Sequence, residues 1–487
     1  TGQYAHNHGV LGNSPPEGGY QAFDGTNMLG LWLQARGYTT AHIGKYLNGY
    51  GGGDSAASVP EGWDEWYTGT AGTGQLVYDY TQNENGALVD YGSDVEDFKQ
   101  DVYTERAVQL IEEHAATSPL YLQLDYTAPH SGGPEPLPQP PNDCRRSARP
   151  APRHATAFDG EPLPTPPSFN EADVSDKPQG IQDLPLMDQA DIDDLTRRYR
   201  CRIESLLSVD EGVADVVAAL RDAGVLRDTY VLFTSDNGFF TGEHRVQNGK
   251  TKVYEPSSTV PLLMRGPEVP EGVSVRDLTI NADLAPTIVD AAGADAGLAP
   301  DGRSLLPAAQ EPWIERGREL LIETNQYDAI HTQRYVWVEY DTGERELYDL
   351  RRDPNQLRSV HDDPDYSGVR QRLVTRLAAL RTCAGASCRE RPDLRLDLDY
   401  SRGPKKCAEP PVEVRVRGGD VPRTESVEFF VGSKLIARDG SSPFETRLSR
   451  RELGGKGPTL IRARASLDDG RRIGWERELR ICSSRRR

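Results

Sequence analysis

The chain has 487 residues, of which 36% are hydrophobic and 27% are charged, and its formal net charge is −19. This length allows two or three domains with a large core, while no apolar run reaches the ~20 residues that a membrane-spanning helix needs. From Lys405 onward 20 Lys and Arg stand against 12 Asp and Glu, so the preceding residues carry −27, a balance that argues against nucleic acid as the main partner.

The first part of the chain alternates predicted helices and strands. Residues 26–36 are expected to form a helix that stops at Gly37. A short strand at residues 38–43 follows and ends before Gly44-Lys45. Residues 102–116 have the pattern of an amphipathic helix, which leads into a strand at residues 120–125 and then to Ala128-Pro129-His130.

Two stretches in the first half have no regular pattern. Residues 49–74 are rich in Gly, Trp and Tyr, and we expect them to form a surface loop. Residues 131–190 are crowded with proline and polar side chains and are too long for an ordinary connection. Segments of this kind are usually functional lids or disordered.

A further strand is predicted at residues 230–235. It reads Tyr-Val-Leu-Phe-Thr-Ser, the pattern of a strand buried on both faces. Long helices are predicted on either side of it, at residues 193–221 and 281–292. Helices that alternate with buried strands predict an α/β fold, with a doubly wound and mostly parallel sheet.

The pattern changes after Arg318. Residues 320–324 and 335–340 alternate like antiparallel strands, and an amphipathic helix at residues 369–380 completes a small α+β subdomain. From Val412 onward the short alternating runs predict a β-sandwich of immunoglobulin-like kind. The predicted domains are therefore an α/β catalytic domain, an α+β subdomain and a β-sandwich, at 1–317, 318–400 and 405–487.

The six cysteines form an even set. Cys383 and Cys388 enclose a short loop, and Cys407 and Cys482 nearly enclose the last domain. No Cys-x-x-Cys pair or Cys/His cluster has the spacing of a zinc site. We therefore expect structural disulfides and an oxidising, extracytoplasmic compartment, with buried free thiols as the alternative.

Polar side chains follow three of the predicted strands. Asp236-Asn237 follows residues 230–235, Lys45 follows the first strand, and His130 follows the strand at 120–125, while Lys250 lies on a later Gly-rich loop. Ligands bind outside the carboxyl ends of strands in α/β sheets. A carboxylate beside a carboxamide supplies oxygen ligands for Ca²⁺ or Mg²⁺. Together with two ammonium groups and an imidazole, these groups suit a tetrahedral oxyanion ester, meaning phosphate or sulfate.

Each of these residues also has a simpler explanation. Asp236-Asn237-Gly238 is a good turn sequence on local grounds. Lys45 could be an ordinary surface lysine, His130 a loop residue fixed by Pro129, and Lys250 part of a charged turn. Their shared position after strands favours a common site.

Several motifs in order along the chain resemble the sulfatase family of the alkaline-phosphatase-like superfamily. The resemblance is to the N-acetylglucosamine-6-sulfatase-like and arylsulfatase branch. It rests on seven stretches between Thr1 and Leu350: Thr-Gly-Gln-Tyr-Ala-His-Asn-His-Gly-Val at 1–10, Ile-Gly-Lys-Tyr-Leu-Asn at 43–48, Ala-Pro-His at 128–130, Thr-Ser-Asp-Asn-Gly at 234–238, Gly-Glu-His-Arg at 242–245, Val-Pro-Leu-Leu-Met-Arg-Gly-Pro at 260–267 and Glu-Leu-Tyr-Asp-Leu at 346–350.

The resemblance implies roles for the strand-end residues. Asp236 and Asn237 would be two ligands of a Ca²⁺ ion. Lys45 and Lys250 would hold the sulfate group, and His130 would assist cleavage of the ester. His244 and His8 would line the pocket.

The chain departs from the family pattern in two places. Leu47 stands where many sulfatases have a histidine, as fits the glucosamine-6-sulfatase-like branch. The family's formylglycine nucleophile comes from a Cys/Ser-x-Pro-Ser-Arg motif just upstream of the Thr-Gly with which this chain opens, and these 487 residues hold no such motif. The family's first strand, with two metal-binding aspartates, is also missing. We therefore expect the nucleophile upstream of Thr1, and this chain alone to be inactive and poorly folded.

The implied function is a Ca²⁺-dependent sulfuric ester hydrolase that acts on a sulfated sugar, including glycosaminoglycan units, or on an aryl sulfate. A formylglycine-generating enzyme would be a partner, and the protein would be secreted or periplasmic. Two alternatives stay open. One is a phosphodiesterase or phosphomonoesterase of the same superfamily, although those enzymes usually hold two metals. The other is a non-catalytic scaffold that binds sulfated glycans.

Overall fold

The computed structural model describes residues 1–52, 55–132, 143–454 and 457–483. Two compact units make up the chain, residues 1–269 with 284–304 and residues 270–283 with 305–487. The first unit holds every predicted site residue, and the second holds both the expected small α+β region and the β-rich end of the chain. Within the described residues, no helix is long and apolar enough to cross a membrane.

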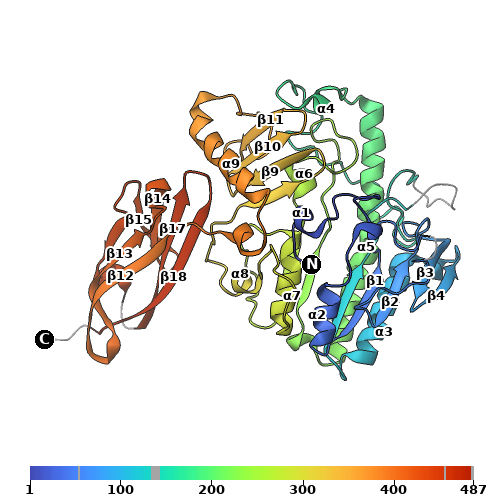
Figure 1. The fold of residues 1–487 in the computed structure, drawn as a ribbon, viewed down its shortest axis with the longest axis horizontal. Coiled ribbons are helices and arrows are strands. Elements are labelled where there is room, and N and C mark those ends of the chain that lie inside the picture. The colour runs from blue at the N-terminus through green and yellow to red at the C-terminus, as the bar shows by residue number, and fades with distance from the viewer. Residues whose placement is uncertain (53–54, 133–142, 455–456, 484–487) are drawn as a thin grey trace. The chain divides into compact units, whose positions relative to one another are not determined.

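A five-stranded sheet forms the centre of the first unit, in the order β4-β3-β2-β1-β5 (Figure 1). Strand β1 pairs in parallel with β2 and β5, whereas β3 and β4 continue the sheet in antiparallel fashion. The strands are β1 (Thr39–Gly44), β2 (Glu65–Gly69), β3 (Tyr80–Glu84), β4 (Ala87–Tyr91) and β5 (Leu120–Asp125).

Both faces of this sheet are covered, as the alternation of helices and strands predicted. Helices α3 (Lys99–His114) and α5 (Gln189–Asp222) meet one face, where Ile43, Tyr103 and Leu110 are buried together. On the other face Met28, at the N-terminal cap of α2 (Leu29–Ala35), packs with Trp66. The unit also contains α7 (Leu284–Ala292) and the short helices α1 (Ala5–His8), α4 (Gln179–Gln182) and α6 (Glu255–Ser258).

Three details differ from the sequence-based expectations. Residues 49–74 are not all loop, because Glu65–Gly69 forms β2 and Trp66 is fully buried. Residues 143–190 pack against the unit in an ordered way and bury Leu163, Ile181 and Met187, so disorder, one of the two alternatives given for residues 131–190, does not hold for this described part. Residues 133–142 of the same segment lie outside the described residues.

The third difference concerns the strand expected to be buried on both faces. Strand β6 (Val231–Thr234) forms a two-stranded antiparallel ladder with β7 (Leu262–Arg265). Phe233 is 37% exposed and Leu263 is 65% exposed. The prediction of burial on both faces is wrong here, because an apolar run shows that a strand can be buried but not how many neighbours it has.

The second unit begins with an antiparallel sheet in the order β11-β10-β9-β8, followed by helix α9 (Ser367–Leu380), as predicted. A buried ion pair joins Arg318 to Asp283 within this unit. The elements are β8 (Leu320–Glu323), β9 (Tyr327–His331), β10 (Tyr335–Tyr340) and β11 (Arg345–Asp349), with α8 (Leu306–Gln310) ahead of them.

The chain then continues into seven further strands with their own apolar core, centred on Val414, Phe429 and Ile461. They are β12 (Arg395–Arg402), β13 (Ala408–Arg417), β14 (Thr424–Val431), β15 (Lys434–Asp439), β16 (Glu445–Leu448), β17 (Gly457–Leu467) and β18 (Arg472–Ile481), with the short α10 (Arg450–Leu453). Strand β12 pairs with β13 and precedes residue 405. The division into three domains remains a prediction.

All six cysteines form disulfides, which confirms the expectation of structural bridges. Cys383–Cys388 closes a short loop after α9, and Cys407–Cys482 joins the start and the end of the β-rich region. The third bridge, Cys144–Cys201, joins residues 143–190, called the Pro-rich segment below, to α5.

Lys99 is an unusual component of the first unit's interior, because its side chain is fully buried. Its Nζ donates to the carbonyl oxygens of Thr73 (3.2 Å) and Gly74 (3.1 Å) and lies 4.1 Å from the ring centre of Tyr80. Burial lowers the pKa of Lys99 to about 7. In an unfolded chain a lysine titrates near ~10.4.

The stability of the protein should therefore depend on pH through Lys99. Between pH 7 and about 10 the unfolded chain binds more protons at this position than the folded chain, so stability rises with pH. We predict that the free energy of unfolding of the wild type, relative to Lys99→Met, increases from pH 7 to pH 9.5, by at most about 1.4 kcal/mol per pH unit. Urea unfolding at both pH values measures this, and a constant difference between the two proteins would contradict it.

Candidate active site

Lys45 directly follows the last residue of β1, at a point where β1 and β5 come very close. Gly44 has a φ of +120°, and a Cβ at this position would lie 2.0 Å from the carbonyl oxygen of Asp125, the last residue of β5. The backbone N–H of Lys45 donates to the same oxygen at 3.0 Å. Only glycine allows this approach, and it fixes where the lysine side chain begins.

The ammonium group of Lys45 is held by its own loop. Its Nζ donates to Asn48 Oδ1 at 2.7 Å and to the carbonyl oxygen of Tyr46 at 3.1 Å. Burial is the main cause that lowers the pKa of Lys45, and the positive charge of Lys250 adds to it, whereas Asp236 and Asp125 oppose the shift. Lys45 therefore lies within electrostatic range of both Asp236 and Lys250.

Asp236 and Asn237 follow β6, as predicted, and Lys250 reaches back to them. Lys250 Nζ donates to Asn237 Oδ1 at 2.7 Å. The turn is tight, because a Cβ at Gly238 would lie 2.2 Å from the carbonyl oxygen of Pro256. The Asp236 side chain is exposed. Four of the five predicted site residues, Lys45, Asp236, Asn237 and Lys250, are thus brought together from three separate segments.

His130 is the predicted site residue for which no contact with this group is found among the described residues. It is exposed, and its Nδ1 lies 3.2 Å from the carbonyl oxygen of Ser131. No contact among the described residues joins its imidazole to the two lysines or to the Asp236-Asn237 pair. The turn that carries it is fixed by a hydrogen bond from His130 N to Thr127 O at 2.9 Å.

His244 does not line an open pocket, contrary to the expectation. It is fully buried, its Nδ1 lies 2.6 Å from Glu171 Oε2, and its ring packs 4.2 Å from that of Tyr254. His8 is partly buried, and its Nδ1 accepts a hydrogen bond from Val10 N at 3.1 Å. The resemblance placed His244 near the site, but its imidazole is used to hold the Pro-rich segment.

The Pro-rich segment is attached to the turn that precedes Lys250. This attachment was not predicted from the sequence. Phe169 forms a β-bridge with Glu243, and Asn170 N donates to Gly242 O at 2.9 Å. The Arg245 guanidinium donates to three carbonyl oxygens of the segment, those of Glu171 (2.8 Å), Ala172 (2.8 Å) and Leu184 (3.0 Å). No sequence pattern reports such backbone-directed contacts.

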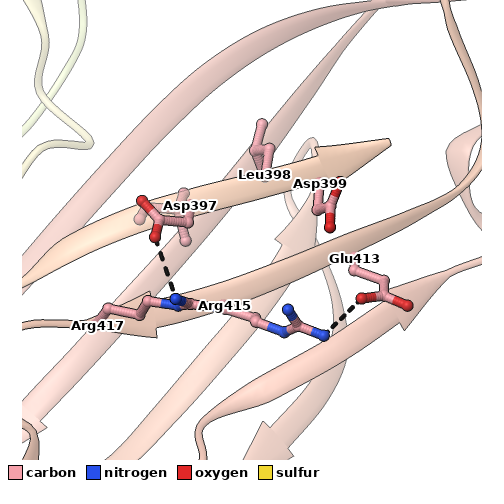
Figure 2. A pocket seen from close by; sticks show the side chains of 7 residues that line it. Asp397, Leu398, Asp399, Glu413, Arg415 and Arg417 are labelled. Carbon is pink, nitrogen blue, oxygen red and sulfur yellow. Dashed lines mark hydrogen bonds and ion pairs between the residues drawn. The ribbon is translucent and has the colours of Figure 1, made fainter. Parts of the chain in front are cut away.

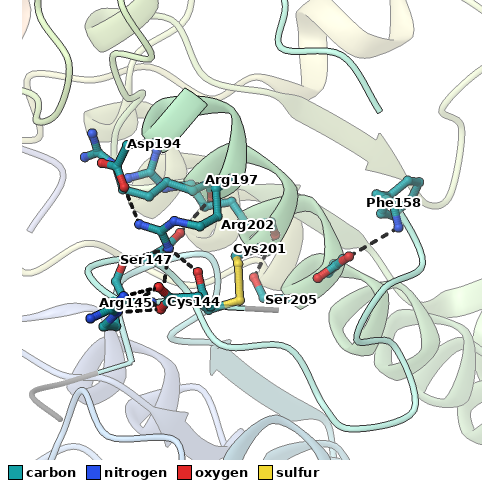
Figure 3. Close-up of a disulfide and its surroundings, with 12 residues drawn as sticks. Cys144, Arg145, Ser147, Phe158, Asp194, Arg197, Cys201, Arg202 and Ser205 are labelled. Carbon is teal, nitrogen blue, oxygen red and sulfur yellow. Dashed lines mark hydrogen bonds and ion pairs between the residues drawn. A yellow bond between two sulfur atoms is a disulfide. The ribbon is translucent and has the colours of Figure 1, made fainter. Parts of the chain in front are cut away.

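A second anchor lies near the start of the same segment (Figure 3). The Cys144–Cys201 disulfide joins the segment to α5, and Ser147 Oγ donates to the carbonyl oxygen of Arg198 at 2.7 Å. Glu204 lies close to the two sulfur atoms. Because both cysteines are oxidised, this buried group has no thiolates with which to bind a metal ion.

The strand-end group fits part of a calcium site. Asp236 offers an exposed carboxylate, and an amide oxygen such as Asn237 Oδ1 has two lone pairs, so it can accept from Lys250 and still face a cation. Calcium takes 6–8 oxygen ligands. The described residues bring two such side chains to this point, and the donor type is the one that calcium requires.

A shallow depression of about 380 Å³ lies on the β-rich region of the second unit (Figure 2). It is lined by Leu396, Asp397, Leu398, Asp399, Glu413, Arg415 and Arg417. Its charges are largely paired with each other, as in Asp397–Arg417 at 3.5 Å and Glu413–Arg415 at 2.6 Å. We assign no function to it.

Two protein-family models match this chain. Residues 1–294 match the family model for Sulfatase, and residues 242–383 match the model for N-sulphoglucosamine sulphohydrolase, C-terminal. The chain belongs to the sulfatase family.

Curated relatives of this sulfatase extend over most of its length. It is 33% identical over 440 residues to an arylsulfatase of Volvox carteri, which covers 80% of the chain and 67% of the relative. It is 30% identical over 441 residues to the N-acetylglucosamine-6-sulfatase of Homo sapiens, with 80% and 76% covered. A Sulf-1 homolog of Caenorhabditis elegans is 34% identical over 341 residues, which span 65% of the chain but 45% of that relative.

Solved structures share the fold of the sulfatase. A protein in complex with its substrate D-glucosamine-2-N,6-O-disulfate superimposes with a TM-score of 0.63 at 22% identity, covering 78% of this chain and 85% of the other. A phosphonate monoester hydrolase from Silicibacter pomeroyi gives a TM-score of 0.54 at 21% identity, with 78% and 84% covered. The predicted α/β fold class is confirmed.

The close approach at Gly44 can be tested with a matched pair of glycines. Gly44 and Gly37 both have positive φ, but a Cβ at Gly37 meets no atom within 4 Å. We predict that Gly37→Ala costs about 1 kcal/mol of stability, from backbone strain alone. Gly44→Ala should cost about 2 kcal/mol more, because the ends of β1 and β5 must move apart. Urea unfolding of both variants checks this, and equal losses would show that the contact is unimportant.

Proposed function

We propose that this protein is the catalytic part of a calcium-dependent sulfuric ester hydrolase. The observation that carries the proposal is the hydrogen bond from Lys250 to Asn237, with Lys45 close enough to Asp236 and Lys250 to interact electrostatically with both, in a chain of the sulfatase family. Two ammonium groups and a pair of oxygen ligands at one strand end provide complementary charge for a tetrahedral oxyanion.

Each residue has a distinct part in this proposal. Lys45 and Lys250 donate hydrogen bonds to the non-bridging oxygens of the sulfate group and offset their charge. His130 protonates the departing alcohol as a general acid. Asp236 and Asn237 hold a calcium ion, which supplies further positive charge at the same oxygens when bound.

The nucleophile in this proposal is a formylglycine upstream of Thr1, made by a formylglycine-generating enzyme. Support comes from membership of the sulfatase family. The described residues hold the substrate and the cation, and the upstream residue attacks the sulfur.

A sulfated sugar is the substrate class we favour, with aryl sulfates as the second. The support is similarity to an N-acetylglucosamine-6-sulfatase and to an arylsulfatase, each over 80% of the chain. We further propose a secreted or periplasmic location. Three disulfides need an oxidising compartment, and a relative from Drosophila melanogaster is named an extracellular sulfatase.

The experiment compares two esters on the product extended upstream of Thr1 and expressed with formylglycine-generating machinery. We predict release of sulfate from 4-nitrophenyl sulfate that falls at least about 100-fold in Lys250→Ala or after removal of calcium by a chelator, because charge stabilisation of this kind is worth 10²–10³ in rate. Lys434→Ala, an exposed lysine of β15, is the control. Release of phosphate but not sulfate from the matched esters would identify a phosphoesterase instead.

A further inference from the structure

The two lysines of the site share an unusual kind of partner. Lys45 Nζ donates to Asn48 Oδ1, and Lys250 Nζ donates to Asn237 Oδ1, each at 2.7 Å. Neither ammonium group forms an ion pair with a carboxylate among the described residues. Both are therefore held by neutral amide oxygens.

Carboxylates are plentiful in this chain, which carries 75 Asp and Glu against 56 Lys and Arg. The buried Lys177, for example, pairs with Asp176 at 3.1 Å and with Glu171 at 3.7 Å. Asp125 ends the strand beside Lys45 and influences it electrostatically, but its Oδ2 is held by His42 (3.2 Å) and Gln123 (2.7 Å). Asp125 is thus directed to other partners, while Asp236, the other acid that acts electrostatically on Lys45, belongs to the proposed calcium site.

Asn48 is itself rigidly placed. Its carbonyl oxygen accepts from Tyr20 N at 2.7 Å, and a Cβ at Gly19 would lie 2.5 Å from that oxygen. Tyr46, two residues before it, packs against the rings of Trp66 (5.0 Å) and Tyr50 (5.7 Å). The backbone from which the Asn48 side chain extends is therefore held in place, which reduces the cost of ordering the Lys45 side chain against it.

A neutral partner and a charged partner have different effects on a bound anion. An amide oxygen orients the ammonium group and replaces part of its lost hydration while the full positive charge remains. A carboxylate would orient it equally well but would cancel that charge and repel the ligand. Whether the partner of the lysine is an amide or a carboxylate affects ligand binding only if the lysine faces an anion.

We propose that Asn48 is a positioning residue that holds the Lys45 ammonium toward the oxyanion of the substrate without neutralising it. This inference rests on the proposed function, because it takes the ligand of Lys45 to be a sulfate group. Asn48 acts through Lys45 and need not touch the substrate. Asn237 has the equivalent relation to Lys250, but its proposed role as a calcium ligand makes it unsuitable for the test.

A purely structural role for Asn48 and the proposed role predict opposite orders for the effects of Asn48→Asp and Asn48→Ala on sulfate binding. Aspartate has the same size as asparagine, suits the same turns and accepts the same hydrogen bond. If Asn48 only shaped the loop, Asn48→Asp would be the mildest substitution and Asn48→Ala a harsher one. If its neutrality matters, the order is reversed.

The test measures the Kd of inorganic sulfate by calorimetry, at constant ionic strength, on the product extended upstream of Thr1, for the wild type, Asn48→Ala, Asn48→Ser and Asn48→Asp. We expect Kd to rise about fivefold in the Ala variant and less in the Ser variant, which keeps a neutral acceptor. In the Asp variant we expect a rise of about fiftyfold, because the lost charge adds to the lost orientation. Circular dichroism and urea unfolding confirm that each variant is folded.

Asn13→Asp is the control for net charge. Its backbone lies beside Gly19, as that of Asn48 does, but its side chain is exposed and makes no contact with Lys45. It should change the Kd less than about twofold. In the product extended upstream of Thr1, the Asn48→Asp variant should also show a higher KM for the sulfate ester than the Ala variant shows.

The outcomes separate this inference from the proposed function. An Asp variant that binds sulfate as tightly as the Ala variant, or more tightly, overturns the role given to Asn48 while the sulfatase assignment stands. A wild type that binds phosphate but not sulfate overturns the proposed function, and the order of the variants with phosphate then decides the inference. Binding of neither anion by the wild type overturns both.

Discussion

The contact between Gly44 and the carbonyl oxygen of Asp125 is the constraint on which the site depends. It lets the ends of two parallel strands meet without a side chain between them, so that the loop carrying Lys45 starts directly beside the end of β5. The parallel register from Thr39–Leu120 to Gly44–Asp125 transmits this placement along the whole of β1. The helices on both faces in turn hold the strands in that register.

The other half of the site is positioned from outside the sheet. Strand β6 has only β7 as a partner among the described residues, and Phe233 is partly exposed. The turn that leads to Lys250 is therefore held by the Pro-rich segment, through the bridge at Phe169–Glu243 and the Arg245 guanidinium. The sheet thus positions Lys45, and the Pro-rich segment holds the turn that leads to Lys250.

The sequence predicted the helices, the strands and the strand-end position of the site residues well. Hydrophobic periodicity and glycine stops are local signals, and they located β1, α3, α5 and α9 within a few residues. Lys45, Asp236 and Asn237 came together as their positions after strands suggested, and Lys250 joins them from its loop. No contact with them is found for His130 among the described residues, although it also follows a strand. Their individual roles stay predictions.

The predictions that failed concern features that depend on contacts between residues far apart in the sequence. The burial of β6 depends on how many strands lie beside it, and the ordering of residues 143–190 depends on contacts with segments far along the chain. The partner of each cysteine could not be chosen from spacing either, and Cys144–Cys201 links two elements that no motif connects. His244 was expected at the pocket because of the resemblance to the sulfatase family, yet its imidazole faces Glu171.

The three hydrogen bonds that Arg245 donates to backbone carbonyl oxygens have a consequence for how the Pro-rich segment can change by mutation. Every amino acid, proline included, has a backbone carbonyl, so the anchor recognises the path of the segment and not its side chains. Residues along that path can be exchanged by mutation while the attachment persists. A segment fastened in this way tolerates changes of its side chains as long as its backbone keeps the same path.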